Sequence, residues 1–246
     1  MNTNSKPLAL VTGATSGIGQ AISFMFSDSG FDVIALGRNE VEVEQMRARE
    51  GIRPLALDLT DRKAVATALE GEEIDVLVNN AGIMPPVVGF DQLAQSDIDE
   101  TLAVNLSATL STTRLVLPAM IARRQGHIFF IGSTAGHAPF PKMAVYGATK
   151  AAIASFSAAL RCDLSGSGVR VTEIVAGRVQ TSLYRDAFSA EVRAEMYSAF
   201  KAVQPEDVAQ MLSAVLAMPP HVDVSRFDIL PTAQFVGGGG FTNKEG

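Results

Sequence analysis

The chain has few of the features that mark secreted, membrane-spanning or nucleic-acid-binding proteins. Its single cysteine, Cys162, excludes an internal disulfide and is typical of a reducing compartment. No apolar run approaches the roughly 18 residues that a membrane span needs, and the polar start Met1–Pro7 contains no secretory apolar segment. The net charge is −6 and no basic run is present, which argues against a nucleic-acid surface. We therefore expect a cytoplasmic protein with neither membrane nor nucleic-acid partners.

Charged residues are scarce as well, at 19% of the chain, whereas apolar residues reach 47% of its 246 residues. This composition supports one large core, and so few charges fit a surface partly covered by neighbouring subunits. Alanines on more than one side of segment 144–165 would let this segment pack closely on a partner subunit as well as on its own sheet; a tightly buried helix of a monomer is the alternative. We expect a homo-oligomer.

Short apolar runs alternate along the chain with longer segments of helical spacing. Several runs are continuous, which is typical of strands covered on both faces. The repetition of strand, helix and strand predicts an α/β fold with a doubly wound parallel sheet and right-handed crossovers, in a single domain over 1–246 whose ends at 1–6 and 237–246 are flexible. The expected strands are Leu8–Thr12, Asp32–Leu36, Arg53–Leu57, Ile74–Val78, His127–Ile131, Arg170–Val175 and Phe227–Leu230. The expected helices are Ile18–Ser29, Glu40–Arg49, Arg62–Leu69, Ser96–Arg124, Ala144–Ser165 and Pro205–Met218.

A glycine-rich turn follows the first expected strand and opens the first expected helix. It reads Thr12-Gly13-Ala14-Thr15-Ser16-Gly17-Ile18-Gly19. Its glycines remove the Cβ atoms that would keep the backbone from a pyrophosphate, and the helix start offers free N–H groups to that anion. A tight strand–helix connection alone could also use such a turn. Its position nevertheless favours a dinucleotide site.

A second group of residues is suited to proton transfer. Tyr146 and Lys150 lie one helical turn apart, and Ser133 ends the fifth expected strand. Hydride transfer to a carbonyl develops negative charge on oxygen, which must be stabilised and protonated. A tyrosine has an ordinary pKa of about 10, and the Lys150 ammonium together with an oxidised nicotinamide would lower the pKa of Tyr146. Ser133 could hold the substrate oxygen meanwhile; an ordinary exposed helical pair is the alternative for Tyr146 and Lys150.

Taken together, these motifs resemble those of the short-chain dehydrogenase/reductase family. The turn matches that family's Thr-Gly-x-x-x-Gly-x-Gly, Asn79-Asn80-Ala81-Gly82 follows the fourth strand, and Ser133 precedes Tyr146-x-x-x-Lys150. The motifs fall in the family's order over essentially the whole chain. The resemblance implies a Rossmann-like sheet of about seven strands with helices on both faces. It also implies an oxidoreductase that transfers a hydride between a nicotinamide cofactor and an alcohol or carbonyl.

The resemblance also assigns roles to single residues. Asn105 would anchor a water in a proton relay from Lys150, and the alternative is a buried asparagine bonding helix backbone. Asp58 would flank the adenine, cap a helix, or do both. Thr181 would meet the nicotinamide carboxamide, after Ala176-Gly177 where the family usually has Pro-Gly. The residues expected to bind cofactor are Gly13, Thr15, Ser16, Gly17, Ile18, Gly19, Arg38, Asp58, Leu59, Asn80, Ala81, Gly82, Tyr146, Lys150, Gly177, Val179 and Thr181.

The residue after the second strand indicates which nicotinamide cofactor is used. An acid there binds the ribose hydroxyls of NAD, whereas an arginine pairs with the 2′-phosphate of NADP. The chain carries Arg38 and no acid at this place, which favours NADP(H). Ser16 stands where NADP-preferring relatives often have a second basic residue, and Glu40 and Glu42 would repel a phosphate. NAD(H) therefore remains the alternative, and no metal ion is expected.

At finer grain, Gly132–Gly136, Tyr146–Lys150 and Leu164–Thr172 look like the subgroup that oxidises serine and other 3-hydroxy acids with NADP. This implies a tetramer, or else a dimer, and a 3-hydroxy acid or small ketone as substrate. A non-catalytic dinucleotide sensor is the alternative from another functional class. The expected substrate residues are Met84, His137, Phe140, Met143, Tyr184 and Arg185. A helical lid would use Tyr184, Phe188, Met196, Tyr197 and Phe200.

Overall fold

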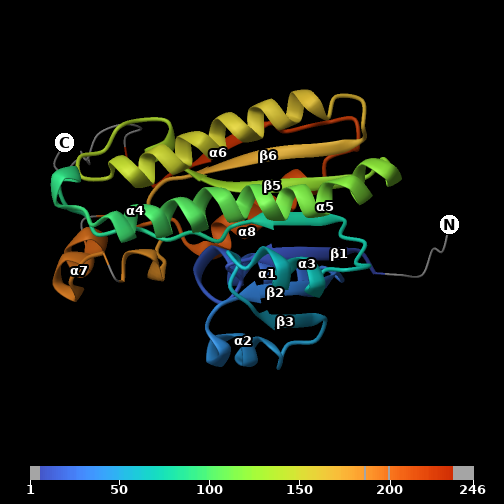
Figure 1. The fold of residues 1–246 in the computed structure, drawn as a ribbon, viewed down its shortest axis with the longest axis horizontal. Helices are drawn as coiled ribbons and strands as arrows, with labels where there is room; N and C mark the ends of the chain where they lie inside the picture. The colour runs from blue at the N-terminus through green and yellow to red at the C-terminus, as the bar shows by residue number, and fades with distance from the viewer. Residues whose placement is uncertain (1–5, 186, 199, 235–246) are drawn as a thin grey trace.

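Seven parallel strands form one sheet in the order β3-β2-β1-β4-β5-β6-β7 (Figure 1). The computed structural model describes residues 6–185, 187–198 and 200–234, so the ends 1–5 and 237–246, for which flexibility is predicted, lie outside the described residues. β1 pairs with both β2 and β4, and the chain therefore changes direction across the sheet between these two neighbours. This arrangement confirms the predicted Rossmann-like fold. The strands are β1 (Leu8–Thr12), β2 (Asp32–Gly37), β3 (Ile52–Ala56), β4 (Val76–Asn79), β5 (Gly126–Ser133), β6 (Val169–Ala176) and β7 (Arg226–Ile229).

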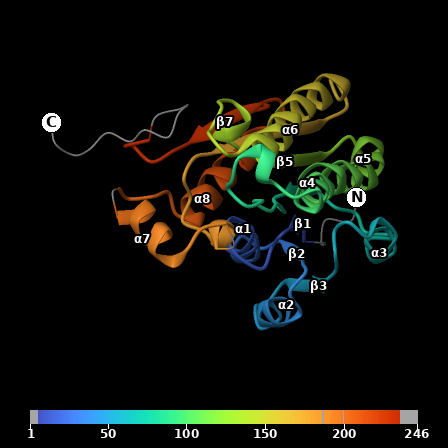
Figure 2. The same cartoon turned by 60° about the vertical axis from the view of Figure 1, so that its left-hand side comes forward.

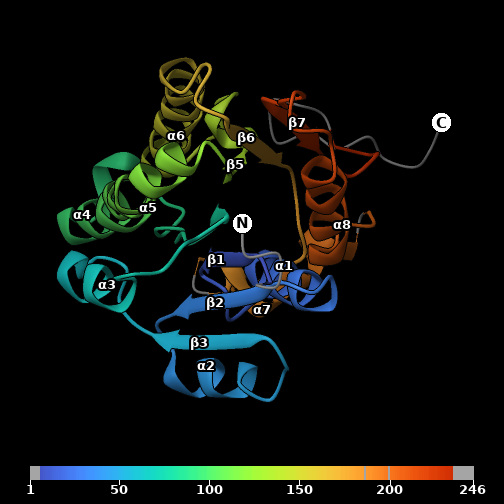
Figure 3. The ribbon, with the colours of Figure 1, turned by 90° about the vertical axis from the view of Figure 1, so that its right-hand side faces the viewer.

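Helices cover both faces of the sheet (Figure 3). Apolar residues of α1, α2 and α8 pack on one face, and those of α3, α5 and α6 on the other. The strand interiors between these two layers are almost fully buried, because both of their side-chain rows face helices. Among the described residues, no helix is long and apolar enough to cross a bilayer. The helices of these two layers are α1 (Gly17–Asp28), α2 (Glu40–Met46), α3 (Arg62–Ala68), α5 (Thr109–Arg123), α6 (Ala144–Asp163) and α8 (Pro205–Leu216).

The single helix predicted over Ser96–Arg124 is divided in the structure. It consists of α4 (Gln95–Leu102), a π-helical stretch over Ala103–Ala108, and α5. The wide turn contains Asn105, whose side chain bonds the backbone of Ile83 outside the helix. A wide turn of this kind often marks a functional site. The structure also has a helix that sequence periodicity does not delimit, α7 (Ala190–Ser198).

The carboxyl ends of the strands gather at one edge of the sheet, where α4 and α7 also lie (Figures 1 and 2). In an open parallel sheet, ligands bind beyond this edge, near the point where the strand order reverses. The reversal lies between β1 and β4. The fold thus places the turn after β1 beside the segment after β4.

Candidate active site

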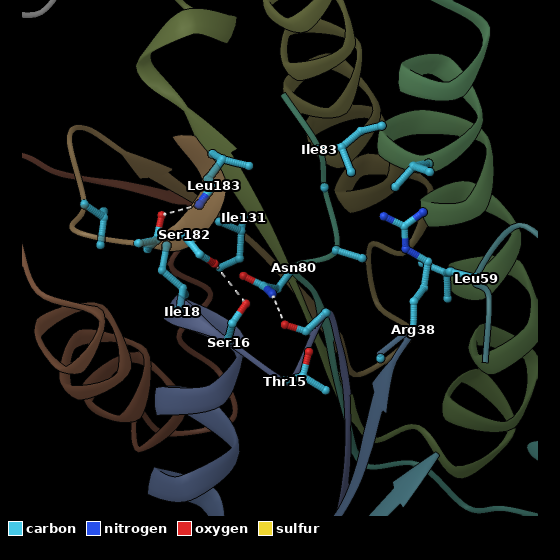
Figure 4. Close-up of a pocket in the computed structure, with 18 of the residues that line it drawn as sticks. Thr15, Ser16, Ile18, Arg38, Leu59, Asn80, Ile83, Ile131, Ser182 and Leu183 are labelled. Carbon is cyan, nitrogen blue, oxygen red and sulfur yellow. Dashed lines mark hydrogen bonds between the residues drawn. The ribbon is translucent and has the colours of Figure 1, made fainter. Parts of the chain in front are cut away.

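A cavity of about 510 Å³ opens at the carboxyl ends of the strands (Figure 4). This volume is in the ordinary range for ligand sites. The cavity is lined by all the residues predicted to bind cofactor except Gly19, and by Ser133. The sequence motifs, which are far apart along the chain, therefore share one site.

The turn after β1 is shaped to receive an anion at the start of α1. Gly13 and Gly17 have φ angles of +62° and +52°, a region that side chains rarely adopt. A Cβ on Gly13 would lie 2.9 Å from the Cα of Ala81. A Cβ on Gly19 would clash with the Gly13 carbonyl oxygen, so Gly19 serves the packing of α1 on the turn and does not line the cavity. The backbone cradle fits the pyrophosphate of a dinucleotide.

Hydrogen bonds join this turn to the segment after β4. The Thr12 hydroxyl accepts from the backbone N–H groups of Asn80 at 3.0 Å and Ala81 at 3.1 Å. The Asn80 amide in return donates to the carbonyl oxygens of Thr12 and Gly13, both at 2.9 Å (Figure 4). Asn80 therefore holds the two loops together from the cavity wall.

The segment after β6 crosses to the same turn. The Ser182 hydroxyl donates to that of Ser16 at 3.3 Å (Figure 4). A Cβ on Gly17 would lie 3.0 Å from the Cγ2 of Thr181. The Thr181 hydroxyl accepts from Leu183 N–H at 3.3 Å and so caps the short 3₁₀ helix over Ser182–Tyr184. Thr181 is placed next to the glycine turn, at one end of the cavity.

Arg38 follows β2 and extends along the cavity, on the other side of Asn80 from Ser16 (Figure 4). Its side chain is 54% exposed and its Nη1 lies 3.5 Å from Glu100 Oε1, a loose surface pair. Hydrogen bonds from Thr60, together with the Arg38 guanidinium, lower the pKa of Asp58. Asp58 lines the cavity and caps the turn at Thr60, whereas Asp61 caps helix α3. Its place beside the adenine stays a prediction.

Ser133, Tyr146 and Lys150 meet where β5 ends beside α6. Lys150 Nζ donates to the Ile131 carbonyl oxygen at 2.8 Å and lies 5.8 Å from the centre of the Tyr146 ring. Tyr146 and Lys150 are only 5% and 6% exposed, so the alternative of an exposed helical pair is wrong. The hydroxyl of Ser133 accepts from the Ala135 N–H at 3.2 Å and lies within hydrogen-bonding reach of Tyr146.

Burial dominates the electrostatics of this group. It raises the pKa of Tyr146, as does the neighbouring Tyr184, while the hydrogen bond with Ser133 acts in the opposite direction. Burial also lowers the pKa of Lys150 to about 8, against an opposing effect of Glu173. Without a cofactor, desolvation of the phenolate outweighs the hydrogen bond with Ser133. The lowering of the Tyr146 pKa by Lys150 together with an oxidised nicotinamide stays a prediction.

Asn105 lies behind the cavity wall and does not line it. Its side chain accepts from Ile83 N–H at 2.8 Å and donates to Ile83 O at 2.9 Å. A Cβ on Gly82 would lie 3.5 Å from Asn105 Oδ1 and 3.8 Å from Lys150 Nζ. Asn105 thus fixes the segment after β4 close to Lys150, while the predicted water relay stays a prediction.

The structure places some of the predicted substrate residues at the cavity and others outside its lining. Tyr184 and Arg185 line the cavity, but Met84, His137, Phe140 and Met143 do not. Met84 is buried away from the cavity, and His137 bonds Glu173 and Arg226. Phe140 and Met143 belong to the loop before α6, where Met143 N–H donates to Phe140 O at 3.3 Å. The role of these four residues in substrate binding stays a prediction, because position after a strand does not fix which way a loop side chain turns.

The predicted lid is partly visible beside the cavity. The rings of Tyr184 and Phe188 lie 5.9 Å apart, and the Tyr197 hydroxyl donates to the Val179 carbonyl at 3.3 Å. Phe200 is buried, at 6% exposed, and the side chain of Met196 lies outside the described part of the structure. Of these side chains, Tyr184 is a neighbour of Tyr146, and closure of a lid stays a prediction.

Comparisons with known proteins give a consistent result. A family model described as short chain dehydrogenase matches residues 7–192. The chain belongs to the short-chain dehydrogenase family. A short-chain type dehydrogenase/reductase, y4eK of Sinorhizobium fredii, is 47% identical over 96% of this chain and 95% of its own length. The NADP-dependent 3-hydroxy acid dehydrogenase YdfG of Escherichia coli K12 is 36% identical over 94% of this chain and 97% of its own.

A solved structure described as the closed form of serine dehydrogenase complexed with NADP+ superposes with a TM-score of 0.90. It is 34% identical and covers 97% of this chain and 100% of that one. The predicted membership of the short-chain dehydrogenase family, with its likeness to serine and 3-hydroxy acid dehydrogenases, is confirmed. The predicted cytoplasmic location and the tetramer or dimer stay predictions.

Sequence reasoning did not identify Glu173, a buried acidic residue near the site of this short-chain dehydrogenase. Glu173 on β6 is 4% exposed and accepts a hydrogen bond from His137 Nε2 at 2.8 Å. A charged residue inside an otherwise largely apolar strand is a signal that could have found it, because buried charges are rare unless paired. His137 gave no such signal, since its partners come from two distant strands.

Proposed function

We propose that this protein transfers a hydride between NADP(H) and the carbonyl or alcohol group of a small substrate. The observation that supports this most is that Ser133, Tyr146 and Lys150 line the same cavity as the glycine-rich turn. A proton donor and an anion cradle are both needed for the reaction, and here both border one space. NADPH, when bound, supplies the hydride to the carbonyl carbon.

In the reductive direction, Tyr146 donates its phenol proton to the carbonyl oxygen that gains negative charge. A phenol has an ordinary pKa of about 10, so Tyr146 carries its proton at neutral pH and can act as the acid. The Ser133 hydroxyl orients the same oxygen, and the Lys150 ammonium, 5.8 Å from the ring, stabilises the phenolate that remains. In the oxidative direction, the phenolate takes the proton from the alcohol.

Replacing Tyr146 tests this mechanism. Tyr146→Phe should lower turnover by about 10²–10⁴-fold, the usual contribution of a positioned acid or base, because the ring stays and only the proton donor is lost. Cofactor affinity, measured by fluorescence of the reduced nicotinamide, should stay within about twofold, since Phe keeps the cavity wall intact. Unchanged turnover in this variant would remove Tyr146 from the chemistry.

Arg38 supports NADP(H) over NAD(H). Its guanidinium extends along the cavity, is half exposed, and is held only by the long contact to Glu100. A 2′-phosphate would give it a charge-assisted, bidentate partner in place of this surface pair. The names of the NADP-dependent relative and of the NADP+ complex agree with this preference.

Arg38→Asp tests the cofactor preference. We expect NADP affinity to fall by roughly 10–100-fold, the loss of a hydrogen-bonded charge pair, with little change or a gain for NAD. Arg47→Asp is the matched control, because Arg47 also forms an exposed surface pair, with Glu44, and does not line the cavity. Equal losses for both cofactors would take Arg38 out of the phosphate site and favour the NAD-linked alternative.

For the substrate we propose small 3-hydroxy acids or the corresponding ketones. The class is the one named for the Escherichia coli relative, and Arg185 brings a cation to the cavity beside Tyr184. An arginine at this place could hold a carboxylate. A screen of alcohols and carbonyls with each cofactor, followed by absorbance of the reduced nicotinamide, should give the highest kcat/KM for acids; a preference for neutral ketones would reject this part.

A further inference from the structure

Glu173 is a buried carboxylate that the proposed chemistry does not use. It lies on β6 opposite Phe130 of β5, and it is 4% exposed. A buried carboxylate is costly unless it is paired and hydrogen-bonded. Packing alone therefore does not explain why a carboxylate is buried at this position.

The carboxylate lies next to the stretch of β5 that Lys150 binds. A Cβ on Gly132 would be 2.5 Å from Glu173 Oε1, so the absence of a side chain at Gly132 makes room for Glu173. The neighbouring carbonyl, that of Ile131, accepts the hydrogen bond from Lys150 Nζ at 2.8 Å. Lys150 thus binds Ile131 and Glu173 adjoins Gly132. These two residues are neighbours in β5 and directly precede Ser133.

A chain of polar contacts connects Glu173 with the surface. Arg226 Nη1 lies 3.3 Å from His137 Nδ1, and His137 Nε2 lies 2.8 Å from Glu173 Oε1. An arginine can only donate, so Nδ1 is the acceptor and Nε2 carries the proton that it donates to Glu173. Asp228 holds Arg226 through two contacts of 2.8 Å. Because His137 donates a hydrogen bond to Glu173, this contact favours the carboxylate form of Glu173.

We propose that Glu173 is a positioning residue for Lys150: its carboxylate, oriented by His137, keeps the Lys150 ammonium charged beside the Tyr146 ring. Without a nearby anion, a buried ammonium tends to lose its proton. Glu173 supplies that anion from the sheet side. The consequence for turnover rests on the proposed function, but the effect on the charge of Lys150 does not.

The electrostatics of the surrounding groups agree with this role. Burial lowers the pKa of Lys150 to about 8, and Glu173 raises it. Among the described residues, the other polar groups facing this region are uncharged alcohols, phenols or amides, apart from the Arg226–Asp228 pair behind His137 and Arg178, which lies over the Tyr184 ring. The uncharged groups are Ser133 from β5, Asn105 from the π-helical stretch, Tyr146 and Thr149 from α6, and Tyr184 after β6.

The test measures the protonation of Lys150 directly. Wild-type protein is labelled with acetic anhydride over a range of pH, and peptide mass spectrometry gives the pKa of each lysine from its labelling rate. Glu173→Gln should lower the Lys150 pKa by ~1 pH unit, as expected for removal of one charge at short range. Exposed Lys142, in the loop before α6, is an internal control whose pKa should not change.

Two further variants keep the proposal falsifiable. Glu173→Asp retains the charge and should restore most of the wild-type Lys150 pKa, which a purely structural role would not predict. His137→Leu removes the donor from a partly exposed loop, so it should fold even where Glu173→Gln does not, and it should shift Lys150 in the same direction by less. A Lys150 pKa equal to that of wild type in both Glu173→Gln and His137→Leu would overturn the proposal. If the labelling shift is found while no alcohol or carbonyl is turned over, the proposed function fails and the role of Glu173 stands.

Discussion

Acid should destabilise this protein through one buried imidazole, that of His127. His127 is 1% exposed on β5 and stacks on Phe129 with ring centres 3.9 Å apart. Its Nε2 lies 2.8 Å from the Thr172 hydroxyl, which itself donates to the Val224 carbonyl at 2.6 Å. The hydroxyl must therefore accept from Nε2–H, so the neutral ring has an unprotonated Nδ1. That Nδ1 is buried and has no hydrogen-bond partner in the part of the chain that the structure describes.

Protonation would place a charge on this Nδ1. Burial, assisted by the charge of Arg170, lowers the pKa of His127 from 6.5 to about 3. The unfolded chain binds the proton below pH 6.5 and the folded one only near pH 3, so stability falls as pH falls through this window. The loss from this one group should be about 2 kcal/mol at about pH 5 and about 4–5 kcal/mol near pH 3.

Urea unfolding of wild type and His127→Gln tests this value. The glutamine can donate to Thr172 but does not titrate, so the difference between the two proteins isolates the imidazole from the carboxylates that both share. From pH 7 to about pH 5, wild type should lose about 2 kcal/mol more free energy of unfolding than the variant. His221→Gln, at an exposed position, should behave as wild type. Equal losses in wild type and His127→Gln would refute the argument from burial.

Two further predictions concern the turn after β1. Gly19→Ala should weaken NADPH binding by at least tenfold, because its Cβ would clash with the Gly13 carbonyl oxygen and shift the cradle; fluorescence titration measures this, and wild-type affinity would contradict it. Thr12→Val should lower the free energy of unfolding by about 1–3 kcal/mol, because the N–H groups of Asn80 and Ala81 lose their acceptor. An unchanged urea midpoint for Thr12→Val would mean that water replaces the hydroxyl.

The fold was largely predictable, and the reasons are local. Short continuous apolar runs such as Leu8–Thr12 and His127–Ile131 are typical of strands covered on both sides, and their alternation with helical segments predicts a parallel sheet. The π-helical stretch around Asn105 was not predictable, because a helix with one wide turn has nearly the same apolar periodicity as a regular one. What decides it is the bond to Ile83, a contact across the fold.

The parts of the site that depend on backbone geometry were predictable from the sequence. The parts that depend on which neighbour a side chain contacts were less so. The glycine turn and the spacing of Tyr146 and Lys150 follow from helix and turn geometry, and the cavity contains them. His137 could have faced the substrate or the sheet, and only the buried Glu173 determines which. The direction of the Tyr146 pKa depends on how completely the phenol is desolvated, which a sequence does not reveal.

The contact between Ser16 and Ser182 joins residues that are 166 positions apart in the sequence. Neither the first half of the polypeptide nor the second could form the dinucleotide cradle and its rim alone, since β1 and the segment after β6 each supply one side. Gain of nicotinamide fluorescence during refolding would consequently mark the moment when the turn after β1 and the segment after β6 have come together. A nascent chain released before β6 is synthesised would not bind the cofactor.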